Sequence, residues 1–447
     1  MGTRAIRAIG VPTLLALGAG VVFATGSAAD SSGQAKVLFD DVRVFDGKRV
    51  LAEADVLVEG DRIRKVEAGG EITPPGGATV VDGEGRTLLP GLLDAHGHML
   101  TVRDMKDALL YGVTTVVSVG ENPGVRDYVT CAGPETDRAD MIISGAFATV
   151  AGSHGTEYPP EVFGDVPVLS NVSEVPGWVQ ARVDEGAHHI KVIVEDLSMF
   201  QETPTPKLPI DILEAVVVEA HAAGLKVVAH ATKAADAKAA LAAGVDGFAH
   251  APVDPIDQEF VDMMLDRDAF MTPTLDVWRA ADGLALGVDE LSDPRIAPWL
   301  SPAGQALMSA AFPPEFGARW DYGSVKSNLA QLRAAGVPIL AGTDAGNPGV
   351  PNGAGMHREM EMLVDAGMSP PQALRSATYQ VAETYGLRDR GGIQQGKLAD
   401  LLLVNGDPTV TILDSRDIAG IWRLGTRVDR ADLLDQAGAG TDPTCAP

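Results

Sequence analysis

Six residues whose side chains can bind metal ions lie inside or just after short apolar runs of the sequence: His96, His98, Lys191, His230, His250 and Asp344. His96 and His98 follow the run Leu88–Asp94 at a spacing of two, which places both imidazoles on one side of an extended chain. Imidazole and carboxylate donors suit zinc, with manganese and iron as alternatives. Lys191 lies within the run Ile190–Val194, and lysine is almost never fully buried without a partner. The pattern therefore predicts a metal site that includes a lysine.

Each of these residues, taken alone, also has a structural explanation. A histidine beside an apolar run is more often a core residue than a ligand, and Asp344 could cap a helix. Their places in the chain favour a shared site, because His230 and His250 each close an apolar run and Asp344 comes two residues after Ile339–Gly342. If these runs are parallel strands, their C-terminal ends meet on the face where barrel enzymes hold their active sites. We therefore expect the six side chains to converge.

The elements that must position these residues repeat one unit along the middle of the chain. A helical, often alanine-rich stretch ends at a glycine, as in Ala242-Ala243-Gly244 and Ala334-Ala335-Gly336, and an apolar strand follows. Glycine just past a helix is typical of the left-handed cap position. The expected strands are Leu88–Asp94, Thr114–Gly120, Met141–Ala148, Ile190–Val194, Val227–His230, Gly247–His250, Phe270–Leu275 and Pro338–Gly342. Eight such units predict an α/β fold, a closed (β/α)8 barrel of the TIM type over residues 88–388.

Short alternating apolar runs flank this middle part at residues 36–87 and 389–434, and they are typical of β-strands. We interpret them as one small β-sandwich domain built from both chain ends, with residues 435–447 as a tail. The stretch between the seventh and eighth strands is too long for one helix. Trp278–Trp320 is therefore interpreted as an insertion over the barrel mouth, with no motif that assigns it a role.

The first 29 residues have the order of a secretory signal: Arg4 and Arg7, the apolar stretch Ile9–Ala24, and small residues before Asp30. We therefore predict a secreted or periplasmic protein without a membrane segment after signal removal, with an uncleaved anchor as the alternative. The formal net charge of −26 argues against nucleic acid and anionic membranes as partners. The two cysteines, Cys131 and Cys445, are compatible with one disulfide, but the sequence leaves their pairing open.

Five segments resemble the amidohydrolase superfamily: Gly91–His98, Ile190–Val192, Ala229–Ala231, Ala249–His250 and Gly342–Gly346. The segment Gly391–Leu401 is similar to that superfamily as well, so the resemblance covers nearly the whole mature chain. The sequence is most similar to the branch that contains imidazolonepropionase-like proteins and metal-dependent Xaa-Pro and Arg/Lys dipeptidases. The resemblance is specific for the superfamily and weak for the substrate.

The resemblance implies a site for two divalent ions, zinc by preference. The first ion would be bound by His96, His98 and Asp344, and the second by His230 and His250. Lys191, carboxylated on its amine by carbon dioxide, would bridge the two as a carbamate. The ions would lower the pKa of a bridging water and polarise the scissile carbonyl, while Asp344 would pass the water's proton to the leaving nitrogen.

Two further histidines are candidates for substrate binding. His154 matches a Gly-Gly-His-Gly-like element of the branch, with Ser153 where glycine is usual. It could polarise the substrate carbonyl or contact the substrate, or it could be a loop histidine bonded to backbone. His357 begins the last large helix and matches the pattern of the branch; the alternative for it is a structural role.

The sequence thus predicts a binuclear amidohydrolase that cleaves an amide C–N bond of a small molecule, either a dipeptide or an N-acyl amino acid. The alternative within this fold is hydrolysis of a cyclic amide, a urea or a carbamate. An alternative of another class is a non-catalytic secreted binding protein on a barrel scaffold, against which the complete set of metal ligands argues. The substrate, the native metal and the formation of a homo-oligomer stay open.

Overall fold

The computed structural model describes residues 35–284 and 288–438. The predicted signal peptide, most of the predicted tail and Cys445 lie outside these residues, so the signal stays a prediction and the pairing of the cysteines stays open. Within the described ranges, no helix combines the length and the apolar character needed to cross a bilayer.

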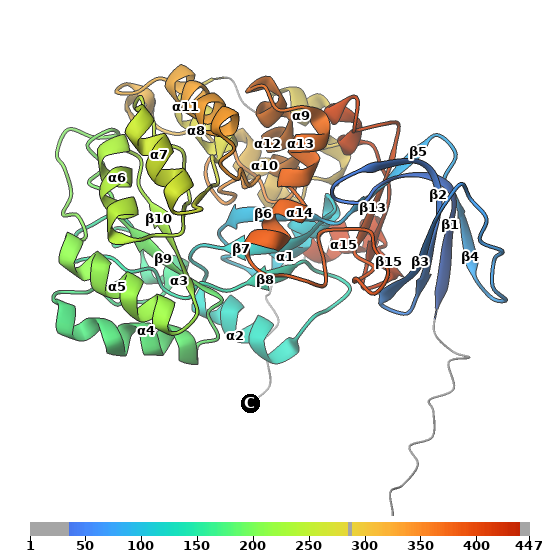
Figure 1. The fold of residues 1–447 in the computed structure, drawn as a ribbon, viewed down its shortest axis with the longest axis horizontal. Helices are drawn as coiled ribbons and strands as arrows, with labels where there is room; N and C mark the ends of the chain where they lie inside the picture. The colour runs from blue at the N-terminus through green and yellow to red at the C-terminus, as the bar shows by residue number, and fades with distance from the viewer. Residues whose placement is uncertain (1–34, 285–287, 439–447) are drawn as a thin grey trace, which may run out of the picture. The chain divides into compact units, whose positions relative to one another are not determined.

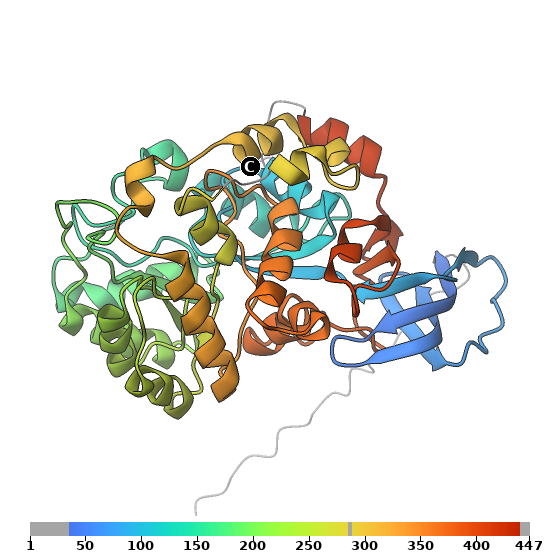
Figure 2. The ribbon, with the colours of Figure 1, turned by 90° about the horizontal axis from the view of Figure 1, so that it is seen from above.

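Strands from both ends of the described chain form one mixed sheet of eight strands, in the order β15-β14-β13-β5-β1-β2-β3, with β4 paired to β1. The bounds are β1 Lys36–Phe45, β2 Val50–Glu59, β3 Arg62–Ala68, β4 Thr79–Asp82, β5 Arg86–Pro90, β13 Leu401–Asn405, β14 Ile418–Arg423 and β15 Thr426–Arg427. Figures 1 and 2 show the N-terminal strands in blue beside the C-terminal strands in red. The join is the antiparallel pairing of β5 with β13. Because these strands belong to a single sheet, the sandwich of two sheets stays a prediction.

This sheet has a hydrophobic core of its own, separate from the main core of the chain. Phe39 from β1 packs edge-on against Trp422 from β14, with ring centroids 4.7 Å apart. Alternation along the strands explains the arrangement, because every second side chain of a strand faces the same side. The residues from the two chain ends thus stabilise each other.

The middle of the chain alternates strands and helices, which confirms the α/β class. One parallel sheet has the order β6-β7-β8, with β6 Leu92–Gly97, β7 Val113–Ser118 and β8 Asp140–Ile142. A second has the order β12-β11-β10-β9, with β9 His189–Ile193, β10 Lys226–His230, β11 Gly247–Phe248 and β12 Phe270–Met271. Single parallel bridges, Ala148 to Val192, Met271 to Ile339 and Gly97 to Ala345, lie at the ends of these sheets. The pairing defines two sheets, and closure into one barrel stays a prediction.

Helices follow the strands of both sheets, as Figure 1 shows. Their bounds are α1 Val102–Leu110, α2 Pro123–Ala132, α3 Pro160–Phe163, α4 Val175–Asp184, α5 Ile210–Ala222, α6 Ala234–Ala243, α7 Gln258–Asp266, α11 Tyr322–Ala335, α12 Ala354–Asp365, α13 Pro370–Ser376, α14 Tyr379–Thr384 and α15 Arg430–Gly438. The predicted glycine caps are confirmed, because Gly244 after α6 and Gly336 after α11 both adopt left-handed backbone angles.

The segment between β12 and α11 folds into short helices. These are α8 Leu275–Ala281, α9 Val288–Ser292 and α10 Pro302–Ser309, with 3-10 turns at Ala297–Trp299 (η3) and Pro314–Gly317 (η4). Two further 3-10 turns lie elsewhere in the chain, η2 at Val172–Glu174 before α4 and η5 at Ile412–Arg416 after β13. This segment contains most of the predicted insertion, and three of its aromatic side chains line the cavity that also contains His98 and Asp344: Trp278, Phe312 and Phe316.

Several of the expected strands differ from the structure. The run Met141–Ala148 is a strand only as far as Ile142, and Pro338–Gly342 contributes only the single bridge at Ile339. The run Leu88–Asp94 is not one strand, because β5 ends at Pro90 in the mixed sheet and β6 begins at Leu92 in a parallel sheet. Gly91 makes the crossing: its N–H donates to the Asp400 carbonyl, and its Cα lies so close to the Thr114 side chain that a Cβ would collide with it. The strand expected at Phe270–Leu275 stops at Met271, because α8 begins at Leu275.

Candidate metal centre

The structure brings His96, His98 and Asp344 together, with one donor atom from each within 4.8 Å of the others. His96 lies near the end of β6, His98 follows that strand, and Asp344 follows the bridge at Ile339. The Nε2 atoms of both histidines lie 3.2 Å from Oδ1 of Asp344. These positions follow from the parallel strands, whose C-terminal ends share one face.

The hydrogen bonds of the imidazoles fix which ring nitrogen carries the proton. Nδ1 of His96 lies 2.8 Å from the Ala249 carbonyl, and Nδ1 of His98 lies 2.9 Å from the Gly120 carbonyl. A carbonyl oxygen only accepts, so both Nδ1 atoms must donate and both Nε2 atoms are left with a lone pair. This outer hydrogen bond is the one that orients a metal-binding histidine.

His250 is held in the same tautomer by a threonine. Its Nδ1 lies 2.9 Å from Oγ1 of Thr274, and that hydroxyl donates to the Pro273 carbonyl at 2.9 Å. Because the hydroxyl proton is used there, the oxygen accepts from His250 Nδ1, and the His250 Nε2 also keeps a lone pair. The rings of His250 and His96 have centroids 4.6 Å apart, and those of His250 and His230 have centroids 4.5 Å apart.

In this arrangement, atoms that can only accept hydrogen bonds face one another. Nε2 of His96, Nε2 of His230 and Oδ1 of Asp344 are buried and have no hydrogen-bond partner among the described residues. Lone pairs that face a carboxylate oxygen at 3.2 Å repel unless a cation lies between them. Nitrogen and oxygen donors of this kind are those that bind zinc and related divalent ions. The residues therefore fit a metal ion.

Electrostatics favours the metal-binding forms of these side chains. Burial and the neighbouring imidazoles hold the pKa of His230 and of His250 well below the ordinary range, so both rings are neutral. Burial acts to raise the pKa of Asp344, but His96, His98 and His250 outweigh burial and hold that pKa well below its usual range. Neutral imidazoles and an ionised carboxylate are the forms that ligate metals.

Lys191 lies in β9 and lines the same cavity with 2% of its surface exposed. Burial lowers the pKa of its amine to about 7, while the negative charge of Asp344 acts in the opposite direction. No hydrogen bond or ion pair to the amine is found in the described part of the chain. A lysine with these properties is neutral for part of the time near neutral pH and is then nucleophilic.

Asp94 and two strained backbone positions hold the site together. Asp94 accepts from the backbone N–H of His96 and of Thr343, each at 3.0 Å, and from the Thr343 hydroxyl at 2.6 Å. It thereby ties β6 to the loop that carries Asp344. Asp344 and Thr274 adopt left-handed backbone angles, with φ of 63° and 49°, a conformation that costs energy for residues other than glycine.

Glu195 is a buried residue of the site that sequence reasoning missed. Its Oε2 lies 3.8 Å from Nε2 of His230 and accepts from the backbone N–H and the hydroxyl of Thr232. Its Oε1 accepts from the backbone N–H of Leu197 at 2.7 Å. The position of Glu195 two residues after β9 was the available signal, because that strand end faces the site.

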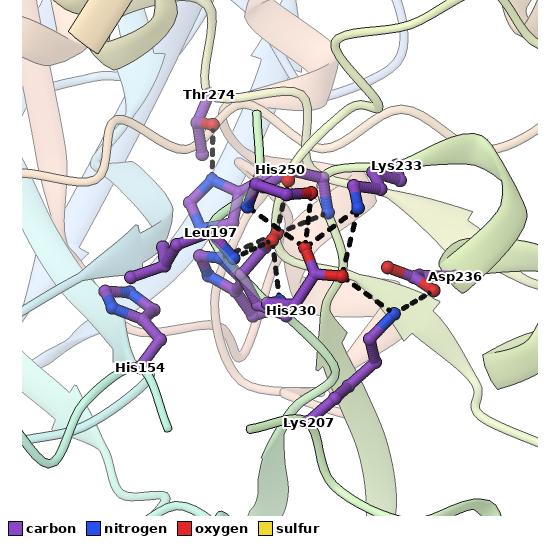
Figure 3. A network of polar contacts seen from close by, with 12 residues as sticks. His154, Leu197, Lys207, His230, Lys233, Asp236, His250 and Thr274 are labelled. Atoms are coloured by element: carbon purple, nitrogen blue, oxygen red, sulfur yellow. Dashed lines mark hydrogen bonds and ion pairs between the residues drawn. The ribbon is translucent and has the colours of Figure 1, made fainter. Parts of the chain in front are cut away.

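Beside Glu195, charged pairs fix the loop that follows β9 (Figure 3). Asp196 pairs with Lys233 at 2.8 Å and with Lys207 at 3.4 Å, and Lys207 reaches Asp236 at 2.6 Å. Both lysines are thus neutralised by carboxylates.

The candidate metal-binding side chains open into a cavity of about 420 Å³. Its lining includes His98, Lys191, His230, His250 and Asp344. His154, a predicted substrate contact, also lines it: the ring lies 4.9 Å from that of His230, and Nδ1 lies 2.6 Å from Oε1 of Glu157.

The structure does not place His357, the other predicted substrate contact, at this cavity. His357 is 1% exposed, and its two ring nitrogens are bonded to the Ser415 hydroxyl and the Tyr111 carbonyl at 3.0 Å and 2.9 Å. Its position one turn inside α12 turns it toward those partners, so the prediction of substrate contact for His357 is corrected to a structural role.

Comparison with known proteins identifies the family of the chain. The model of the amidohydrolase family matches residues 87–428. The imidazolonepropionase of Streptomyces coelicolor is 25% identical over 396 residues, which cover 85% of this chain and 93% of that protein. A solved structure of a putative prolidase from Bifidobacterium longum is 26% identical with a TM-score of 0.70, covering 91% of this chain and 99% of the other.

A solved structure of a Xaa-Pro dipeptidase with methionine bound in its active site is similar in fold, with a TM-score of 0.72 at 23% identity, over 88% of this chain and 100% of the other. The resemblance to the superfamily predicted from the sequence is thus confirmed. Since the family model spans most of the chain, the protein belongs to the amidohydrolase family and is a metal-dependent hydrolase that acts on carbon–nitrogen bonds.

Proposed function

We propose that this protein is a secreted binuclear amidohydrolase that cleaves an amide C–N bond of a small substrate. The observation that carries the proposal is the convergence of imidazole lone pairs on the Asp344 carboxylate. His96, His98 and Asp344 would hold one metal ion, and the neighbouring pair His230 and His250 would hold the second. Lys191, buried in the same cavity without a partner, would carry a carbamate that ligates both ions.

The chemistry divides between the ions and the chain. When bound, the ions would supply Lewis acidity, which activates a water molecule and polarises the substrate carbonyl. Asp344 would accept the proton from that water on its carboxylate and pass it to the leaving nitrogen. His154, at the cavity wall beside His230, would donate a hydrogen bond to the carbonyl oxygen from its Nε2.

The two candidate classes of substrate differ in whether the substrate carries a free carboxylate. A dipeptide or an N-acyl amino acid has a free carboxylate, which needs a cationic side chain in a buried cavity. Among the described residues that line this cavity, the basic side chains are Lys191 and four imidazoles, and all of them belong to the metal centre or adjoin it. This observation favours uncharged members of the second class, the cyclic amides, ureas and carbamates.

Two structural parts of the proposal extend beyond the sheets. We propose that the two parallel sheets close into one (β/α)8 barrel, since single bridges and the Ala95 to Ala341 hydrogen bond span their ends. We also propose export through a signal ending near Ala29. Mass spectrometry of the exported protein should find a chain that starts near Asp30, whereas a chain with Met1 in the membrane fraction would contradict export.

Metal content and turnover test the main proposal. The purified protein should contain about two divalent ions per chain, lose activity on chelation and regain it with Zn²⁺. Asp344→Asn should lower kcat by about 10²- to 10⁴-fold toward a simple amide. Asp127→Asn, at an exposed carboxylate on α2, is the matched control and should keep full activity. A metal-loaded protein that binds amides without cleaving any would support the non-catalytic alternative.

A further inference from the structure

We propose that the cavity selects uncharged substrates with an aryl ring next to the scissile amide, held between two aromatic walls above the metal centre. This inference rests on the proposed function and narrows its substrate to N-acyl arylamines, arylcarboxamides and related aryl ureas. It arises from the placement of seven aromatic side chains around the cavity: Phe147, Tyr158, Phe163, Phe200, Trp278, Phe312 and Phe316.

The first wall is a stack of rings from α8, η4 and the loop after β9. Phe200 stacks on Phe316 with centroids 4.6 Å apart and on Trp278 at 5.8 Å, and Phe312 stacks on Phe316 at 5.0 Å. The Trp278 ring lies 5.3 Å from the ring of His250. One wall therefore begins at a proposed ligand of the second metal ion and extends outward through parallel rings.

The second wall adjoins His98 and consists of rings packed edge to face. Phe163 contacts Phe147 at 5.6 Å and Tyr158 at 5.3 Å. Its ring lies 5.5 Å from that of His98, a proposed ligand of the first ion. The two walls thus adjoin different halves of the metal centre, and a flat apolar group in the cavity would contact one or both.

The charges of the cavity exclude the opposite class of ligand. Besides the metal centre and His154, its polar lining in the described chain includes Glu157, Gln201 and Asn347. Glu157 is paired with His154 at 2.6 Å, and the amide of Asn347 donates to the Asp344 carbonyl at 3.0 Å. Away from the metal centre and His154, a substrate carboxylate would meet Glu157 and apolar rings, so it would lose its hydration there without gaining a cation from the described lining.

The reaction balances without a co-reactant. The oxygen of one water molecule forms a bond to the acyl carbon and the C–N bond breaks. One proton of that water reaches the leaving nitrogen by way of Asp344, and the other is released from the new carboxylic acid. The products are a carboxylate and an amine, or for a urea a carbamate, which releases carbon dioxide, and an amine, and nothing is oxidised or reduced.

Matched substrates test the selection. Zn²⁺-loaded protein would be assayed with acetanilide and N-methylbenzamide, with each of these compounds bearing a para carboxylate, and with the aliphatic N-ethylacetamide. For at least one neutral aryl amide, kcat/KM should be about tenfold or more higher than kcat/KM for its para-carboxylate derivative and for N-ethylacetamide. Burial of an aryl ring is favourable, whereas burial of an unpaired charge is unfavourable. A carboxylate that is cleaved as fast as its neutral partner would overturn the inference while the proposed function stands. If no amide is cleaved, the proposed function itself fails.

Two variants assign the effect to the walls. Phe316→Leu, which shortens the stack, should raise KM for the preferred aryl amide several-fold and leave KM for N-ethylacetamide unchanged. Trp299→Leu is the matched control, because Trp299 lies in the same insertion but packs under Arg430, outside the cavity. Equal effects of both variants on both substrates would contradict the role of the wall.

Gln201→Arg provides an independent test that does not disturb the core, since Gln201 is exposed at the cavity rim. The added cation should narrow the gap between each neutral aryl amide and its carboxylate by about threefold or more, through a lower KM for the carboxylate. An unchanged gap in a variant that folds and binds metal as the parent does would show that missing cationic charge is not what excludes carboxylates.

Discussion

Two buried polar clusters of this protein differ in whether their charges are matched by other described residues. At the cavity, imidazole lone pairs and an unpaired lysine surround one carboxylate, and buried acceptor atoms lack partners in the described chain. Where the mixed sheet meets β8, Arg423 is fully buried too, but both oxygens of Asp400 bind its Nη1 at 2.9 Å and 2.7 Å. Its Nη2 also lies 3.1 Å from Asp140.

The difference separates a binding site from a structural joint. In the Arg423 cluster, positive and negative charges match within the chain, so the fold is complete without a ligand. At the cavity, the charges match only if cations are added. The two clusters therefore differ in charge rather than in the count of hydrogen bonds, because Nη2 of Arg423 also lacks a hydrogen bond among the described residues but is paired with the Asp140 carboxylate.

The largest effect is expected from the lysine of the cavity. Under the proposed two-metal arrangement, Lys191→Ala should lose the second metal ion and about 10²-fold or more of the activity, because the proposed bridge would need an anionic oxygen. Acetate or propionate should restore part of the activity by occupying the space that the truncation leaves. A ¹³C signal of a carbamate in parent protein supplied with ¹³CO₂, absent from the variant, is the readout that does not depend on turnover.

Lys191→Met serves as the control for that rescue. The methionine side chain fills the space, so added carboxylates should not restore activity, and the free energy of unfolding should stay near that of the parent. Full activity in either variant, or a parent protein without a carbamate, would exclude the bridging role of Lys191.

A substitution in the Arg423 cluster should lower stability and leave activity unchanged. Arg423→Met leaves Asp400 buried without its partner and should lower the free energy of unfolding by about 3–5 kcal/mol, measured by urea denaturation. The kcat of the molecules that remain folded should not change. The double variant Arg423→Met/Asp400→Leu should recover part of the loss, and a double variant as unstable as the single one would mean that the pair contributes more than matched charge.

Asp107 on α1 is an intermediate case, a buried carboxyl bonded to a hydroxyl instead of a cation. The Ser301 hydroxyl donates to it at 2.9 Å, and burial raises its pKa from 3.8 to about 7. Between about pH 4 and pH 7 the folded state keeps a proton that the unfolded state loses, so this group makes stability fall as the pH rises through that window.

Asp107→Asn should therefore remove this fall, which is on the order of 1.4 kcal/mol for each unit of pKa difference. Urea denaturation of both proteins at pH 4.5 and pH 8 measures this change in the free energy of unfolding. Relative to the parent, the variant should be more stable at pH 8 than at pH 4.5. The same difference between the proteins at both pH values would show that Asp107 ionises normally in the folded state.

The part of the site that the sequence predicts is the part carried by strand ends. His96, His98 and Asp344 meet because parallel strands bring their C-terminal ends to one face, a rule that periodicity in the sequence can apply. The break at Gly91 was not predictable, because an unbroken apolar run looks the same whether it stays in one sheet or crosses to another. His357 likewise matched a pattern, but its burial depends on α12 packing near Ser415 and Tyr111.

The aromatic walls of the cavity could not be predicted from strand ends or from periodicity in the sequence. Phe163, Phe200 and Phe316 come from separate loops and short turns, whose conformations follow from tertiary packing rather than from local periodicity. Glu195 shows the same limit, since a carboxylate after a strand gives no sign of which side chains it will reach. Residue type and position predicted the metal-binding side chains, while the shape of the cavity above them required the folded chain.

The left-handed backbone conformation at Thr274 and Asp344 constrains which substitutions the protein can accept in evolution. Each of these conformations costs of the order of 1–3 kcal/mol in a residue other than glycine, and each holds a side chain that the centre uses directly or through His250. Selection for heat resistance alone would favour glycine or asparagine at both positions and would discard turnover in exchange. A lineage that keeps Thr274 and Asp344 is therefore one in which catalysis has been under continuous selection.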